Sequence, residues 1–136
     1  MAATVRDFMN PKLAYVREGD RAELALQPIL DFGITAVPVV DEDDRPVGVI
    51  SIRDLVDPKR KGARISAPVE KIGIDVPIAV AARALTDANV HHLVVVDADG
   101  RTAGMLSALD VVRPLLGVSA KHPRAIETFD RPVGRT

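Results

Sequence analysis

The sequence predicts an α+β fold in which two pseudo-symmetric β-α-β-β-α repeats pack sheet to sheet into one disc. Three observations predict it. The middle of the chain is duplicated, each copy combines a crossover helix with a hairpin, and neither copy is long enough to bury its own core. The chain has 136 residues, of which 47% are hydrophobic, which suits one core shared between two halves.

The duplication has no gap. Residues 33–56 align with residues 89–112, and nine of these 24 positions carry the same residue, where composition alone would give about two. Most other positions exchange similar side chains, such as Ile50 with Leu106. Two copies of one small unit must pack on each other, and their pseudo-twofold symmetry leaves two equivalent clefts between them.

The first repeat opens with a leader over residues 4–11 and a short strand over residues 13–16. Apolar residues at helical spacing then predict a helix from an N-cap Asp20 to Gly33, which suits a left-handed C-cap. Pro28 lies inside this pattern and lacks a backbone donor, so the helix is expected to kink or break there.

Two strands and a short helix complete the first repeat. The apolar, β-branched run over residues 36–41 predicts a strand buried on both faces. A turn at residues 42–45 leads to a strand over residues 46–50. Ser51 then begins a helix that ends near residues 57–58.

The second repeat follows a basic connector over residues 57–64, which is expected to be an exposed loop. Its first predicted elements are a strand over residues 69–72 and a helix from an N-cap Asp75, with Pro77 in the first turn. Two strands follow over residues 92–97 and 102–106, joined by a turn at Asp99-Gly100. The last predicted element is a helix from Ser107 to about residue 116.

The chain is therefore divided into three parts. Residues 1–58 form the first repeat with its leader, and residues 59–116 form the second repeat with the connector. Residues 117–136 have little periodicity and are expected to be extended or partly disordered, or else to dock through Ile126 and Phe129.

Composition argues against several classes of protein. The absence of cysteine excludes disulfides and thiolate metal sites and agrees with a cytoplasmic location. A net charge of −1 and only four aromatic residues argue against nucleic-acid binding. No apolar run approaches the roughly 18 residues of a membrane span, and no signal peptide is visible.

Catalytic and metal-binding motifs are not found either. The sequence has no nucleophile elbow and no glycine-rich phosphate loop, so an enzyme is not expected. His91 and His92 are adjacent and would face opposite sides of a strand, which does not suit a shared metal ion.

The candidate chemistry lies in a duplicated Ser-x-x-Asp motif, Ser51 with Asp54 and Ser107 with Asp110, where a strand meets a helix. One interpretation is structural, because this spacing is close to that of a capping box. The other is a ligand site, because a helix N-terminus with a hydroxyl suits phosphate and a carboxylate accepts from sugar hydroxyls. The residues alone leave both interpretations open.

The sequence around these motifs resembles a known family. Residues 37–41 followed by residues 46–55 resemble a CBS domain, named for cystathionine β-synthase, and residues 91–112 resemble a second copy. The pair resembles a tandem CBS module, also called a Bateman module, over about residues 4–116. The resemblance implies that adenosyl ligands such as AMP, ADP, ATP or S-adenosylmethionine bind in the two clefts and regulate an attached or partner protein.

The resemblance also implies roles for individual residues. Asp54 and Asp110 would accept hydrogen bonds from ribose hydroxyls, and Ser51 and Ser107 would contact phosphate. The other residues implied for the Ser51 cleft are Thr35, Ala36, Val37, Pro38, Ile65, Ser66 and Glu70, and those for the Ser107 cleft are His91, His92, Leu93, Met9, Asn10 and Ala14.

The two copies differ in the cations they offer. Arg53 could pair with a phosphate in one cleft, whereas Leu109 at the matching position cannot. His92 could supply a cation in the other cleft, and binding would then strengthen as pH falls through the histidine range. An ordinary rim or core histidine is the alternative.

The expected function is a stand-alone regulatory module that binds an adenosyl ligand, needs no further cofactor, and signals to an effector protein in trans by a conformational shift. The alternative is a ligand-free homodimer in which both motifs are only helix caps. Apolar residues expected near helix surfaces, such as Ile29, Leu85, Leu115 and Leu116, predict a homodimer.

Overall fold

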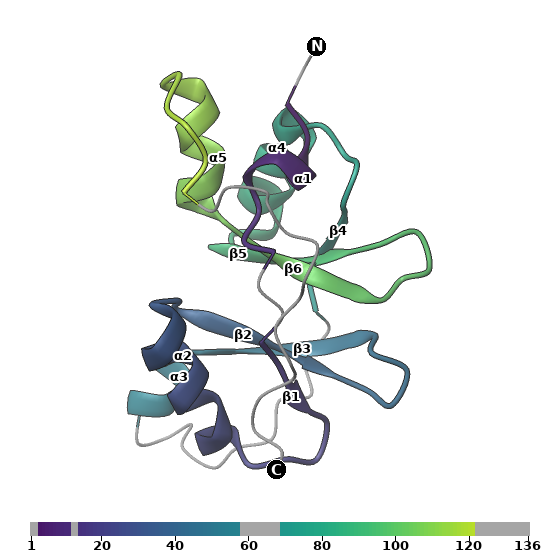
Figure 1. Cartoon of the computed structure of the whole chain (residues 1–136), viewed down its shortest axis with the longest axis vertical. Helices are drawn as coiled ribbons and strands as arrows, with labels where there is room; N and C mark the ends of the chain where they lie inside the picture. Colours follow the sequence, from purple (N-terminus) through teal and green to yellow (C-terminus); the bar gives the residue numbers. More distant parts are fainter. Residues whose placement is uncertain (1–2, 12–13, 58–68, 122–136) are drawn as a thin grey trace.

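The computed structural model describes residues 3–11, 14–57 and 69–121, and these form two sheets of identical topology (Figure 1). The first sheet contains β1 (Val16–Arg17), β2 (Ala36–Val40) and β3 (Pro46–Ser51), and the second contains β4 (Lys71–Gly73), β5 (His92–Val96) and β6 (Thr102–Ser107). In each sheet the first strand runs parallel to the middle strand and the last runs antiparallel to it.

The two sheets face each other and the helices lie outside them (Figure 1). The helices are α1 (Val5–Phe8), the 3-10 helix η1 (Ala22–Ala25), α2 (Leu26–Phe32), α3 (Ile52–Val56), α4 (Ile78–Ala88) and α5 (Ala108–Leu115). Ala36, Val94 and Met105 are buried between the sheets. The predicted fold of two pseudo-symmetric β-α-β-β-α repeats packed sheet to sheet is thus confirmed.

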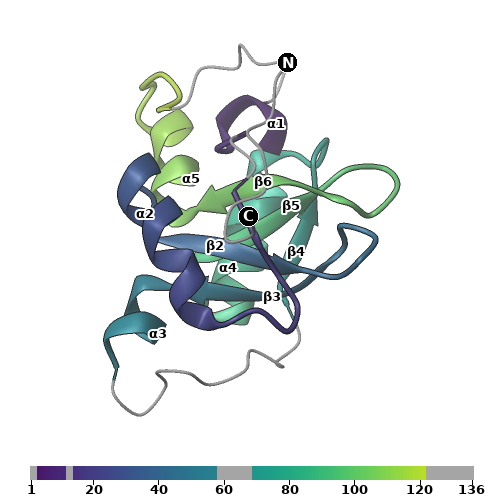
Figure 2. The same cartoon turned by 60° about the horizontal axis from the view of Figure 1, so that its bottom comes forward.

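The duplication extends to backbone irregularities. The register of β2 against β3 shifts between Val39 and Val40, and that of β5 against β6 shifts between Val95 and Val96. The two hairpin turns lie side by side at one end of the molecule (Figures 1 and 2), where the Thr102 N–H donates to the Asp44 carbonyl at 2.8 Å. Equivalent sequences therefore adopt equivalent backbones in both repeats.

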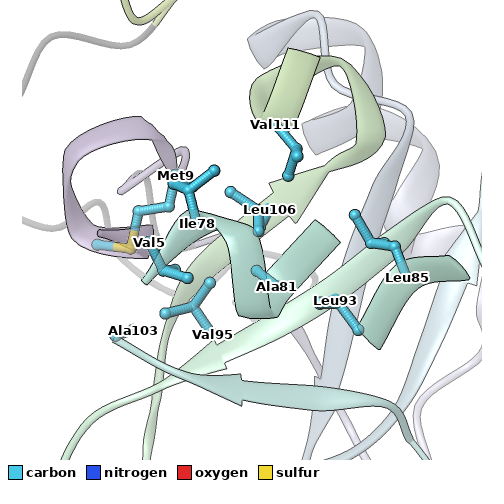
Figure 3. Close-up of a cluster of buried hydrophobic side chains, with 10 residues drawn as sticks. All are labelled: Val5, Met9, Ile78, Ala81, Leu85, Leu93, Val95, Ala103, Leu106 and Val111. Carbon is cyan, nitrogen blue, oxygen red and sulfur yellow. The ribbon is translucent and has the colours of Figure 1, made fainter. Parts of the chain in front are cut away.

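The leader before the first repeat packs on the second repeat. The N–H groups of Val5 and Asn10 donate to the carbonyls of Val76 and Met105, each at 2.8 Å. Val5 and Met9 also enter the hydrophobic core of the second repeat (Figure 3). The short helix α1 in this leader was not predicted, since four residues carry too little periodicity to reveal a helix.

Both aspartates predicted as N-caps have other roles. The Asp20 carboxylate accepts from the Arg17 N–H at 3.0 Å, and Arg21 is the N-cap residue of η1. Asp75 forms an ion pair with Arg6 at 2.8 Å, and Pro77 is the N-cap residue of α4. These two predictions were wrong because each carboxylate has an alternative partner nearby.

The helix changes from 3-10 to α geometry at Ala25–Leu26, just before Pro28, rather than breaking at the proline itself. The predicted single helix is divided into η1 and α2, and Pro28 is the third residue of α2. A proline is tolerated in the first turn, where backbone N–H groups have no intrahelical partner. Gly33 ends α2 in the left-handed conformation, with φ of 62°, as expected.

The apolar residues proposed for a helix surface fall into two groups. Ile29 and Leu85 are buried in the cores of their own repeats, so their prediction as surface residues was wrong. Leu115 and Leu116 are 76% and 70% exposed, as expected. Leu109, beside the second Ser-x-x-Asp motif, is likewise 74% exposed.

Several predictions concern residues outside the described ranges. These are most of the basic connector, the cleft residues Ile65 and Ser66, and the tail residues Ile126 and Phe129. Among the helices that the structure describes, none has the length and apolar character that crossing a membrane requires.

Candidate functional site

A cavity of about 330 Å³ lies between the two repeats. The first repeat contributes the chain before and at the start of β2, the second contributes the start of β5, the end of β6 and the start of α5, and the leader closes one side. The lining residues are Asn10, Ala14, Gly33, Ile34, Thr35, Ala36, His91, His92, Met105, Ser107, Ala108, Leu109, Asp110 and Lys121.

The start of α5 gives the cavity its carboxylate. The Ser107 N–H donates to Asp110 Oδ2 at 2.8 Å, and the Asp110 N–H donates to Ser107 Oγ at 3.2 Å. This reciprocal pair is a capping box, so the structural interpretation of the motif holds. The cap also fixes the direction of the carboxylate, which a ligand site requires.

The Asp110 carboxylate has acceptor capacity beyond the cap. Asp110 is only 5% exposed, yet it lines the cavity. Its Oδ2 accepts from the cap, and none of the described residues donates a hydrogen bond to Oδ1. A carboxylate oxygen that faces a partly enclosed cavity gains more from a donor than one in bulk water, because the lower local dielectric strengthens the bond.

A hydrogen bond joins the two repeats across the cavity wall. Thr35 Oγ1, before β2, lies 2.9 Å from His92 Nε2, at the start of β5. Burial of His92, together with the neighbouring His91, lowers the pKa of His92 below its ordinary value of 6.5, against a smaller opposing effect of Asp110. His92 is therefore mostly neutral at pH 7.

The structure brings together six of the eight residues that the Ser107 cleft was expected to contain. These are Asn10, Ala14, His91, His92, Ser107 and Asp110. The other two, Met9 and Leu93, lie in the hydrophobic core instead, at 4% and 1% exposure. Both histidines reach the cavity despite being adjacent, because β5 begins only at His92 and His91 precedes the strand.

Thr35 and Ala36 were expected in the other cleft but line this cavity. The pseudo-twofold arrangement places the segments before β2 and β5 next to each other, as the Thr35–His92 bond shows. One segment from each repeat thus contributes to the same cavity. The single sequence could not reveal this, because the contact spans 57 residues.

The residues assigned to the Ser51 cleft are described only in part. Ser51 and Asp54 form a capping box at the start of α3, with the Ser51 N–H donating to Asp54 Oδ2 at 2.8 Å. Arg53 is exposed on α3 and Pro38 is fully buried in β2. Because Ile65 and Ser66 lie outside the described residues, a cavity on this side stays a prediction.

Several lining residues were not singled out from the sequence. Ala108 lies within the Ser-x-x-Asp spacing, and Gly33 and Ile34 come directly before the predicted Thr35, so position could have indicated all three. Lys121 belongs to no motif, and only the folded chain places it at the cavity.

Across residues 3–11, 14–57 and 69–121, no cluster of three or more histidine, aspartate or glutamate side chains could hold a metal ion.

Comparison with solved structures shows the same architecture. A structure of CBSX2 in complex with AMP is 31% identical, with a TM-score of 0.68 over 84% of this chain and 96% of that chain. CBSX2 is a CBS-pair protein of Arabidopsis thaliana. The CBS domain of a bacterial CNNM/CorC family Mg²⁺ transporter, in complex with ATP, is 26% identical, with a TM-score of 0.68 over 85% of this chain and 89% of that chain.

Curated relatives are longer proteins. The magnesium transporter MgtE of Thermus thermophilus is 36% identical over 74 residues, which are 54% of this chain and 16% of the transporter. Inosine-5'-monophosphate dehydrogenase of Mycobacterium tuberculosis is 32% identical over 104 residues, which are 73% of this chain and 19% of the enzyme. The chain spans 12% to 47% of the length of the first three curated relatives that it matches.

The family comparison covers both repeats. The CBS domain profile matches residues 5–58 and again residues 63–117. These two matches agree with the duplicated sequence and with the two sheets of identical topology. The chain belongs to the CBS domain family and contains a tandem pair of CBS domains.

Proposed function

We propose that this chain is a regulatory module that binds an adenosyl ligand of the AMP, ADP or ATP class and signals to a partner protein by a conformational shift. The observation that carries the proposal is the composition of the cavity wall. Ser107 and Asp110 of the second repeat share it with Thr35 and Ala36 of the first. A ligand held there contacts both repeats, so its binding biases their relative arrangement.

The cavity chemistry suits a nucleoside. Its volume of about 330 Å³ falls within the range of small-molecule sites. Asp110 Oδ1 can accept from ribose hydroxyls, as the family resemblance implies. Ile34, Ala36 and Met105 add apolar wall that an aromatic base can cover. The AMP and ATP complexes of the two related CBS structures support the same ligand class.

The direct test is calorimetry with AMP, ADP, ATP and S-adenosylmethionine, accompanied by thermal shifts. Replacing Asp110 by alanine removes a charge-assisted hydrogen bond to the ligand. Affinity should fall by about 1.5–3 kcal/mol, or roughly 10- to 150-fold. Asp54→Ala removes the equivalent cap and carboxylate of the first repeat, so it should weaken any site in the Ser51 cleft while binding in this cavity keeps its affinity. Ligand binding that Asp110→Ala leaves unchanged would contradict the assignment of this cavity.

The module is proposed to act in trans as a cytoplasmic homodimer without catalytic activity of its own. Exposed apolar side chains on and beside α5, namely Leu109, Leu115 and Leu116, offer a surface that a second copy can cover. Analytical ultracentrifugation should show a dimer of the 14.6 kDa chain. A single monomeric species at micromolar concentration would reject the dimer.

A ligand-free homodimer remains the second candidate. It is favoured by one observation, namely that both Ser-x-x-Asp motifs form complete capping boxes and so have a structural reason to exist. This candidate predicts that no adenine nucleotide raises the melting temperature. A ligand-dependent shift of several degrees would eliminate it.

A further inference from the structure

We propose that Lys121 binds the anionic group of the ligand in this cavity, so that a residue beyond the second repeat selects for phosphate. The inference rests on the proposed function and adds a specificity determinant to it. Lys121 lines the cavity together with Asp110, although it lies 11 residues further along the chain. It also lies outside the segments matched by the family profile, the second of which ends at residue 117.

The end of α5 explains how Lys121 reaches the cavity. The Gly117 N–H donates to the Pro114 carbonyl at 3.2 Å, and the Val118 N–H donates to the Arg113 carbonyl at 2.9 Å. With Gly117 at φ of 68°, these bonds form a Schellman motif, which reverses the chain at the helix C-terminus. The segment that follows runs back beside α5 toward its first turn (Figure 1).

A side chain of α5 holds the reversed segment in place. Arg113 Nη1 donates to the Ser119 carbonyl at 2.9 Å, two residues before Lys121. The guanidinium therefore ties the returning chain to the helix whose N-terminus forms the cavity wall. This second anchor makes the approach of Lys121 to Ser107 and Asp110 a feature of the fold.

The charges on the cavity wall make Lys121 the residue that can bind an anionic group of the ligand. Of the lining residues that the structure describes, Asp110 is the one acidic residue and Lys121 is the one lysine or arginine, with His91 and His92 as the other titratable groups. His92 uses one ring nitrogen in its bond to Thr35, and burial lowers its pKa. Arg53 and Arg113 are not on this wall, so neither can replace Lys121 there.

Lys121 is also available to a ligand. It is exposed, and among the described residues no carboxylate forms an ion pair with it. Asp110 and Lys121 give the cavity one acceptor and one cation, which matches a molecule with hydroxyl donors at one place and a phosphate at another. A neutral nucleoside would use only the first of these groups.

The test compares AMP, adenosine and inorganic pyrophosphate by calorimetry on the wild type and on three variants. Lys121→Gln removes the charge, Lys121→Arg retains it, and Lys71→Gln removes the charge of an exposed lysine that does not line the cavity. We expect Lys121→Gln to weaken AMP binding roughly three- to tenfold and adenosine binding less than twofold. Lys121→Arg and Lys71→Gln should stay within about twofold of the wild type for AMP.

The outcomes separate this inference from the proposed function. If AMP binds and Lys121→Gln leaves its affinity unchanged, or weakens adenosine equally, the charge role of Lys121 is overturned while the proposed function stands. If no adenosyl compound binds but pyrophosphate binds in a Lys121-dependent manner, the proposed function fails and the anion site stands. If no adenosyl compound binds and pyrophosphate does not bind either, both are rejected.

Discussion

The starts of α3 and α5 have the same local structure in different surroundings. In both, the serine N–H donates to the aspartate Oδ2 at 2.8 Å, and the aspartate N–H donates back to the serine hydroxyl at 3.3 Å or 3.2 Å. Yet Asp110 is buried whereas Asp54 is half-buried. The helices also differ, with five residues in α3 and eight in α5.

The surroundings of α5 come from three parts of the chain. The leader pairs with β6 through Asn10 and Met105, the first repeat contributes Thr35, and the chain after α5 returns with Lys121. A duplicated motif therefore sets the direction of a carboxylate, and segments outside the second repeat contribute to what that carboxylate faces. The following predictions test this distinction, starting with the largest expected effect.

The absence of a side chain at Gly104 lets the leader pack closely against β6. A Cβ at this position would lie within 2.4 Å of the Asn10 carbonyl oxygen, which is backbone and cannot rotate away. Gly104→Ala should lower the free energy of unfolding by about 1–3 kcal/mol through overpacking and should weaken nucleotide binding, because Asn10 lines the cavity. Urea denaturation and calorimetry measure both effects.

Gly73→Ala is the matched control for this change. A Cβ there would meet only the Val76 Cγ2 methyl at 3.3 Å, and a side chain can move by a few tenths of an ångström. Its cost should be clearly smaller than that of Gly104→Ala. Equal stabilities of the two variants would show that the leader does not depend on the close approach at Gly104.

The two capping serines should contribute equally to stability. Ser51→Ala and Ser107→Ala each remove a hydroxyl that accepts from an N–H in the first turn, so each should cost about 0.5–2 kcal/mol. Ser119→Ala is the control, since within the described residues only its backbone carbonyl is hydrogen-bonded, and it should stay within about 0.5 kcal/mol. A cost confined to one of the two serines would mean that the duplicated caps are not equivalent.

A smaller difference between the repeats should appear with pH. His92 occupies the position that Ala36 occupies in the first repeat. Because burial lowers the pKa of His92 in the folded state below its ordinary value of 6.5, the unfolded chain binds more protons in that range. The free energy of unfolding should therefore fall as pH decreases through 6.5 and below.

His92→Asn should flatten this pH dependence. Urea denaturation at a pH above and a pH below the histidine range, for wild type and variant, measures the difference in slope. Asp110, His91 and Lys121 share the cavity with His92, and they remain unchanged in the variant. An unaltered slope would indicate that His92 does not lose its proton more easily in the folded protein.

Sequence patterns predicted much of the fold and about half of the cavity wall. The duplicated strands and Ser-x-x-Asp motifs were recognisable because their signals are local: β-branched runs, a turn glycine and a fixed cap spacing. The predicted N-caps at Asp20 and Asp75 were wrong, because each carboxylate has a competing partner. Asp20 accepts from the Arg17 N–H, and Asp75 pairs with the Arg6 guanidinium. The partner of Asp20 lies only three residues away, whereas that of Asp75 lies 69 residues away and is brought near by the fold.

The sequence by itself determined the repeated β-α-β-β-α unit and the caps at Ser51 and Ser107, because these depend on contacts between residues a few positions apart. Only the tertiary structure decided that Thr35 faces His92 and that Lys121 returns to the start of α5. These contacts join distant segments, and burial of apolar surface across the whole molecule selects among the many ways to pair them.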